Sequence, residues 1–85
     1  MQKKQINKEI IHKFRMKLRT LKLEDKLDVF PIENTFTRRQ RYWIDGQTGK
    51  AFFKVHMWDL NSLEEYELEQ EINARISAAR AYFQM

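Results

Sequence analysis

Apolar residues in the first third of the chain recur at the period of an α-helix. Their spacings are four, four, four and three residues, along the series Ile6, Ile10, Phe14, Leu18 and Leu21. Because an α-helix has 3.6 residues per turn, residues at these spacings share one face. The pattern predicts an amphipathic helix over residues 6–23, and Pro31 prevents that helix from continuing further along the chain.

The middle of the chain has the composition of β-strands. Residues 38–45 and 50–58 are rich in aromatic and β-branched side chains, and the segment between them contains Gly46 and Gly49, the only glycines present. Glycine accepts the backbone conformations of tight turns, so this arrangement predicts a β-hairpin. Residues 27–33 are expected to form a short edge strand, because the proline within them cannot donate a hydrogen bond to a neighbouring strand.

A second helix is predicted near the end of the chain. Ser62 and Glu65 have the spacing of a capping box, in which each side chain accepts a hydrogen bond from a backbone N–H of the first turn. Apolar residues then recur at helical spacing: Leu68, Ile72, Ile76, Ala79 and Phe83. Together these elements predict one small basic α+β domain over residues 1–85, made of an N-terminal helix, a two- or three-stranded antiparallel sheet and a C-terminal helix.

The predicted core takes the apolar faces of both helices and one face of the hairpin. It comprises Ile10, Phe14, Leu18, Leu21, Ile44, Phe53, Val55, Leu68, Ile72 and Ile76. The chain has no cysteine, so disulfides and thiolate zinc sites are excluded, and packing alone must stabilise the fold. No apolar run approaches the roughly 18 residues that a membrane span needs. We therefore expect a soluble, cytoplasmic protein.

Positive charge is concentrated in the first part of the chain. Residues 1–26 contain nine Lys and Arg against three acidic residues, whereas residues 59–85 contain two against six. On the first predicted helix the cations recur at helical intervals: Lys4, Lys8, Arg15, Arg19, Lys22 and Lys26. This stripe fits the phosphates of a nucleic acid, and it equally fits an acidic protein groove, an anionic membrane surface or a solvated helix face.

The faces of the hairpin follow from the length of its loop. With a four-residue loop over residues 46–49, Trp43 pairs with Phe52, and paired residues share a face. One face is then apolar: Tyr42, Ile44, Ala51, Phe53, Val55 and Met57. The other interleaves cations with flat rings: Arg39, Arg41, Trp43, Phe52, Lys54, His56 and Trp58. Such a surface is typical of proteins that bind single-stranded nucleic acid, because cations neutralise phosphates while rings stack on bases.

Two alternatives to that interpretation stay open. A loop of three or five residues would change the pairing parity and mix the two faces. The two helices could also cover both faces of the ribbon, with the acidic second helix supplying anions to the hairpin cations. Trp43, Phe52 and Trp58 would then be interior, as large aromatic side chains often are.

The segment YWIDGQTGKAFF, residues 42–53, resembles the arm-binding N-terminal domain of lambda-type phage integrases. The resemblance rests on a D-x-x-T-G-K turn that joins two strands of a small sheet, with a helix following. The present chain differs in placing a long basic helix first, in lacking a clear first strand and in carrying an acidic final helix. The resemblance implies an exposed sheet surface that meets DNA.

The sequence predicts no catalytic group, metal ligand set or cofactor. His12 and His56 are the only histidines, and neither has an acid partner at a diagnostic spacing. The favoured function is non-enzymatic binding of DNA or RNA. The predicted contact residues are Lys8, Arg15, Arg19, Lys22, Arg38, Arg39, Arg41, Trp43, Lys54 and Trp58.

The runner-up is a function of another class. A small phage- or plasmid-type protein with one basic and one acidic helix could bind an acidic protein partner and inhibit or modulate it, for example a nucleic-acid enzyme. A homodimer stays open as well, since no heptad pattern requires one. Binding of nucleic acid by the isolated chain distinguishes the two functions.

Overall fold

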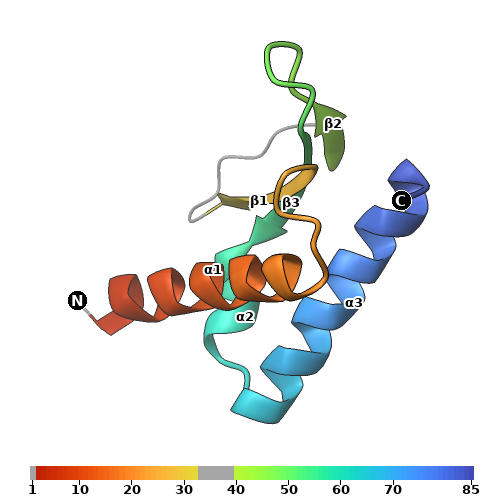
Figure 1. Ribbon diagram of the computed structural model, residues 1–85. Helices are drawn as coiled ribbons and strands as arrows, with labels where there is room; N and C mark the ends of the chain where they lie inside the picture. Colours follow the sequence, from red (N-terminus) through yellow and green to blue (C-terminus); the bar gives the residue numbers. More distant parts are fainter. Residues whose placement is uncertain (1, 33–39) are drawn as a thin grey trace.

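Three helices and three strands make up the described chain, which covers residues 2–32 and 40–85 of the computed structural model, with α1 side chains described from residue 8. The elements are α1 (Gln2–Thr20), β1 (Leu27–Ile32), β2 (Tyr42–Ile44), β3 (Ala51–His56), α2 (Met57–Asn61) and α3 (Glu65–Phe83). β3 lies between β1 and β2 in one sheet, with α1 below the sheet and α3 running obliquely beside it (Figure 1). The predicted α+β fold, with a long helix at each end, is confirmed.

The sheet is mixed, and this differs from the purely antiparallel sheet that we predicted. β2 pairs with β3 in antiparallel orientation, and Trp43 faces Phe52 as the four-residue loop required. β1 pairs with β3 in parallel orientation, with Leu27 opposite Ala51. β1 therefore lies at the opposite edge of the sheet from β2, although the two follow one another in the sequence. The edge position of β1 was predicted, and it suits a strand whose proline lacks an N–H.

The core lies between the sheet, α1, α2 and α3. The predicted core is confirmed for Ile10, Phe14, Leu18, Phe53, Val55, Leu68, Ile72 and Ile76. At its centre the rings of Phe14 on α1 and Phe53 on β3 have centroids 5.9 Å apart. β1 adds Leu27 and Val29 to this core, both at most 1% exposed. The parallel pairing of β1 thus gives the sheet a second apolar strand beside β3.

Two residues predicted for the core are exposed instead. Leu21 is 37% exposed because α1 ends at Thr20, so Leu21 no longer lies on the buried helical face. Ile44 is 61% exposed. It ends the edge strand β2, where the hairpin projects beyond the helices (Figure 1).

α1 ends in a Schellman motif. Lys22 adopts a left-handed backbone conformation, with a φ of 61°. This turn lets the Leu23 N–H donate to the Leu18 carbonyl at 2.8 Å, and the Lys22 N–H donate to the Arg19 carbonyl at 2.9 Å. The two bonds satisfy carbonyls of the last helical turn and reverse the chain towards β1.

The chain after β3 also differs from the prediction. We expected a strand as far as residue 58 and a helix capped by Ser62. Instead β3 ends at His56, and α2 follows at once, burying Met57 and Leu60 on one side. These apolar residues are three apart, which suits a helical turn better than a strand. Ser62 is the C-terminal cap of α2, and Glu64 precedes α3 without a side-chain cap, so the predicted capping box is wrong.

Candidate nucleic-acid interface

One flank of α1 presents a row of exposed cations. Lys8, Arg15 and Arg19 are spaced by seven and four residues, and all three are exposed. At 3.6 residues per turn they lie roughly 100–140° around the helix axis from the buried Phe14. Lys22 lies in the turn that follows the helix and is exposed as well. We call these four residues the basic flank. The helix thus brings three of the predicted contact residues together on one side, and Lys22 follows in the next turn.

The acidic residues of α3 reach the opposite flank of α1. Lys13 Nζ lies 3.9 Å from Glu65 Oε2, and Lys17 and Glu69 line one shallow hollow together. The acids of the last helix are therefore placed near cations that the predicted interface did not include. This segregation leaves the basic flank without an ion pair to α3 among the described residues.

Arg15 is held in place by the first strand. Its Nε donates to Asp28 Oδ1 at 3.1 Å and its Nη2 to Asp28 Oδ2 at 3.4 Å. Asp28 Oδ1 also accepts the N–H of Val29 at 2.8 Å, which fixes the carboxylate. A guanidinium has five N–H donors, so Arg15 can hold this pair and still donate to a phosphate oxygen.

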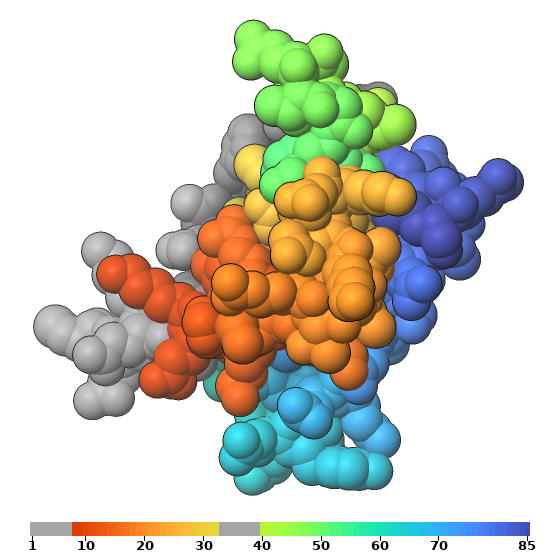
Figure 2. Space-filling model, in the orientation of Figure 1, coloured from red at the N-terminus to blue at the C-terminus, as the bar shows by residue number. Residues whose placement is uncertain are grey.

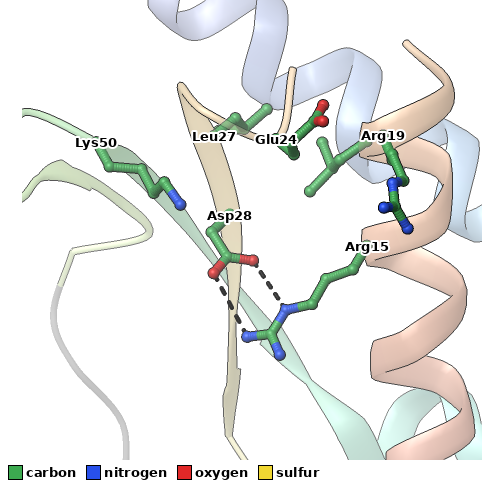
Figure 3. Close-up of a pocket in the computed structure, with 7 residues that line it drawn as sticks. Arg15, Arg19, Glu24, Leu27, Asp28 and Lys50 are labelled. Atoms are coloured by element: carbon green, nitrogen blue, oxygen red, sulfur yellow. Dashed lines mark hydrogen bonds and ion pairs between the residues drawn. The ribbon is translucent and has the colours of Figure 1, made fainter. Parts of the chain in front are cut away.

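A hollow of about 330 Å³ lies between the basic flank and the hairpin. Its lining residues are Arg15, Leu18, Arg19, Glu24, Leu27, Asp28 and Lys50. Figure 3 shows Arg15 extending from α1 to Asp28, while Lys50 points towards the same carboxylate from the opposite side. Three cations thus face two carboxylates, so the hollow has an excess of positive charge.

Lys50 is a cation that the sequence did not place in the interface. The hydrogen bond from the Ala51 N–H to the Lys26 carbonyl, at 2.8 Å, brings the start of β3 next to the turn after α1. This contact belongs to the parallel pairing of β1 with β3, which no local pattern of the sequence signals. In the space-filling view, α1, the turn after it and the hairpin loop therefore form one continuous face (Figure 2).

The hairpin residues of the predicted interface are not arranged as the sequence predicted. The Trp43 ring stacks on Phe52, with centroids 5.9 Å apart and planes at 9°, and it meets the edge of Phe30 at 5.1 Å. Trp43 is therefore half-buried within the protein's own aromatic cluster. Lys54 is only 6% exposed, whereas Arg41 is exposed. Arg38 and Arg39 lie outside the described residues.

Trp58 belongs to α2 and not to the strand in which we expected it. Its side chain is 42% exposed, and its ring centroid is 4.7 Å from that of His56. Arg75 of α3 lines one hollow with Arg41 and Lys54, and its Nε donates to Glu71 Oε1 at 3.0 Å. The structure does not gather Arg41, Trp43, Lys54 and Trp58 on one exposed surface. The interleaved face that we expected is replaced by an internal ring cluster and separate exposed residues.

Metal binding and membrane crossing find no support in the described part of the chain. Over residues 2–32 and 40–85, no three His, Asp or Glu side chains lie close enough to hold a metal ion. In the same ranges, no helix has both the length and the apolar character that crossing a membrane demands.

Comparisons with protein-family models, with curated proteins and with solved structures found no match for this chain.

Proposed function

We propose that this protein binds nucleic acid without catalysing a reaction, and that the basic flank of α1 contacts the phosphates. The observation that carries the proposal is the row of exposed cations Lys8, Arg15 and Arg19 on one side of a helix whose other flank faces acids. Phosphates recur along a nucleic acid, so a linear row of cations can neutralise several of them. The net charge of +4 favours the same class of partner.

The binding proposed here depends on phosphates and not on base sequence. Between residues 8 and 20, α1 contains no Asn or Gln that could pair with adenine in the major groove. Contacts from the four residues of the basic flank would give a salt slope of about −3.6 for duplex DNA. The proposal therefore predicts binding that weakens steeply with salt and is similar for unrelated sequences.

The hairpin has a smaller part in this proposal than its sequence indicated. The nearly buried Lys54 is not assigned a phosphate, while the exposed Arg41 is. Trp58, at 42% exposure, is assigned to stacking on single-stranded bases. Trp43, Arg38 and Arg39 remain predicted contacts from the sequence alone. We place the protein in the cytoplasm on the basis of its cysteine-free composition.

An acidic protein partner is the second candidate, and one feature of α1 and the turn after it favours this partner. Met16 and Leu21 lie among the cations and are 43% and 37% exposed. Apolar side chains beside cations suit the groove of an acidic protein better than a row of phosphates. The protein would then act as an inhibitor or modulator of that partner, such as a nucleic-acid enzyme.

The decisive experiment compares two charge-matched variants in fluorescence-anisotropy titrations with labelled duplex DNA, single-stranded DNA and RNA, at roughly 50 and 200 mM salt. The variant Lys8→Gln/Arg19→Gln removes two cations from the basic flank. Its control, Lys13→Gln/Lys17→Gln, removes two cations from the opposite flank of the same helix. The exposed Lys13–Glu65 pair contributes little to stability, so both variants should fold, as circular dichroism would verify.

The basic-flank variant should bind at least about tenfold more weakly at 50 mM salt, and its salt slope for duplex DNA should decrease by about 1.8. The control should lose much less affinity. Equal losses in both variants would mean that net charge alone governs binding, and would remove the flank from the site. No binding of the unmodified protein at the lower salt would overturn the nucleic-acid proposal and favour the acidic protein partner.

A further inference from the structure

The outer side of β2 is an unpaired strand edge among the residues that the structure describes. Residues of an antiparallel strand direct their backbone groups alternately towards and away from the partner strand. The Arg41 carbonyl accepts a bond from the Lys54 N–H, and the Asp45 N–H donates to the Lys50 carbonyl. The backbone N–H and C=O groups of residues 41, 43 and 45 therefore face β3. By this alternation, Tyr42 and Ile44 direct their N–H and C=O groups outward.

A hollow of about 520 Å³ lies beside this edge. Its lining residues are Gln40, Tyr42, Trp43, Ile44, Tyr82 and Phe83. Tyr42 stacks on Tyr82, with centroids 4.4 Å apart, yet Ile44 and Tyr82 are still 61% and 62% exposed. Exposed apolar side chains beside an unpaired edge are the features that admit another strand.

We propose that this edge binds the same edge of a second copy of the chain. The two β2 strands would pair in antiparallel orientation about a two-fold axis at Trp43, and the two sheets would become one. In this register Tyr42 lies opposite Ile44 of the second copy. The outward N–H and C=O groups of both residues then meet their partners, as an antiparallel ladder requires. Ile44 would cover the exposed ring of Tyr82 in the second copy.

The charges at the ends of β2 favour this register. Residues 41 and 45 are equally distant from Trp43, so Arg41 of each copy lies opposite Asp45 of the other. Opposite charges at such cross-strand positions stabilise pairing, and these positions bring side chains closest together because they lack direct backbone hydrogen bonds. An axis at Tyr42 or Ile44 would place Arg41 or Asp45 opposite Trp43 instead. The segment from residue 41 to 45 is thus complementary to itself, which a foreign peptide would match only by chance.

Sedimentation of the unmodified protein over a range of concentrations tests the proposal. The mass should rise with concentration from 10.5 kDa towards twice that value. A strand pair of this length buries little area, so we expect a dissociation constant of roughly micromolar or weaker. Ile44→Pro removes the outward N–H without touching the hydrogen bonds to β3, and should raise the dissociation constant at least about tenfold. Ile44→Val retains the N–H and should change it little.

A charge reversal keeps the test valid if the proline variant fails to fold. Arg41→Asp should weaken the dimer, because the substitution places a carboxylate opposite Asp45 of the second copy, whereas Arg41→Lys keeps the cation and should weaken it much less. A protein that stays monomeric at millimolar concentration would overturn the proposal and leave the edge to a different partner strand. A dimer that is insensitive to both Ile44→Pro and Arg41→Asp would overturn it as well. Ile44→Pro and Ile44→Val change no residue assigned to nucleic acid, so with these two variants the dimer proposal is tested separately from the nucleic-acid proposal.

Discussion

Replacing Lys22 with glycine should stabilise the protein while weakening its binding to nucleic acid. Lys22 occupies the left-handed position of the Schellman motif after α1, with a φ of 61°. A side chain with a Cβ is strained there, whereas glycine is not. The same residue belongs to the basic flank, where its ammonium group is exposed. One substitution thus separates a contribution to stability from a contribution to binding.

The size of the stability effect follows from two opposing terms. The left-handed conformation costs a residue with a Cβ roughly 1–2 kcal/mol, and glycine avoids this cost. Glycine also makes the unfolded chain more flexible, which lowers the free energy of unfolding by about 0.4–1 kcal/mol. The net gain should be about 0.5–1 kcal/mol. For a domain of this size, that corresponds to a rise in Tm of about 2–8 °C.

Gln84→Gly is the matched control for this substitution. Gln84 follows α3 with a φ of 59°, and there too the next residue, Met85, donates its N–H to a carbonyl five residues back, that of Arg80, at 2.9 Å. Both glycine variants should therefore raise Tm in thermal unfolding. Only Lys22→Gly should weaken DNA binding, by about two- to fourfold at 50 mM salt for one lost phosphate contact. A lower Tm for Lys22→Gly would refute the strain argument, and unchanged affinity would exclude Lys22 from the interface.

Two further predictions concern the hairpin turn and the core. The Thr48 hydroxyl and then the Gln47 N–H donate to the Asp45 carboxylate and lower the pKa of Asp45 below its ordinary value of 3.8. The charged form is favoured by folding, so this contribution to stability is present above pH 3.8 and is lost as the pH falls through the folded-state pKa. Thr48→Ala should shift the Asp45 titration in NMR spectra back towards 3.8, and an unchanged titration would contradict the assigned cause. Phe14→Ala should lower the free energy of unfolding in urea by about 3–5 kcal/mol, since the Phe14 ring is fully buried. A loss below about 1 kcal/mol would contradict its central place in the core.

Local patterns in the sequence were sufficient to predict the elements whose residues contact near neighbours in the sequence. The helical spacing around Phe14 identified the buried face of α1. The four-residue loop fixed the pairing of Trp43 with Phe52, because hairpin register depends on the turn alone. The short helix α2 was missed because its five residues are too few to show a period against the strand composition around them.

Contacts between distant segments explain the remaining differences in the candidate site. The parallel pairing of β1 with β3 brings Phe30 against Trp43 and places Lys50 beside the basic flank. It also puts Phe30 opposite Lys54, next to a side chain that we had expected in solvent. Strand alternation gives the face of a side chain but not what covers that face, so the burial of Lys54 could not be read from the hairpin.

The central position of β3 has a consequence for the order in which the protein folds. Both edge strands bond to β3, and β1 meets it in parallel orientation across a long intervening segment. Helix α1 packs against β1, α2 and α3, so its apolar face has all of its final contacts only when elements that are far apart in the sequence have come together. The hairpin can form early because its contacts are local, whereas the contacts between α1 and α3 join segments that are far apart in the sequence and form late. The apolar face around Phe14 is therefore one of the last parts of the core to be fully covered as the chain folds.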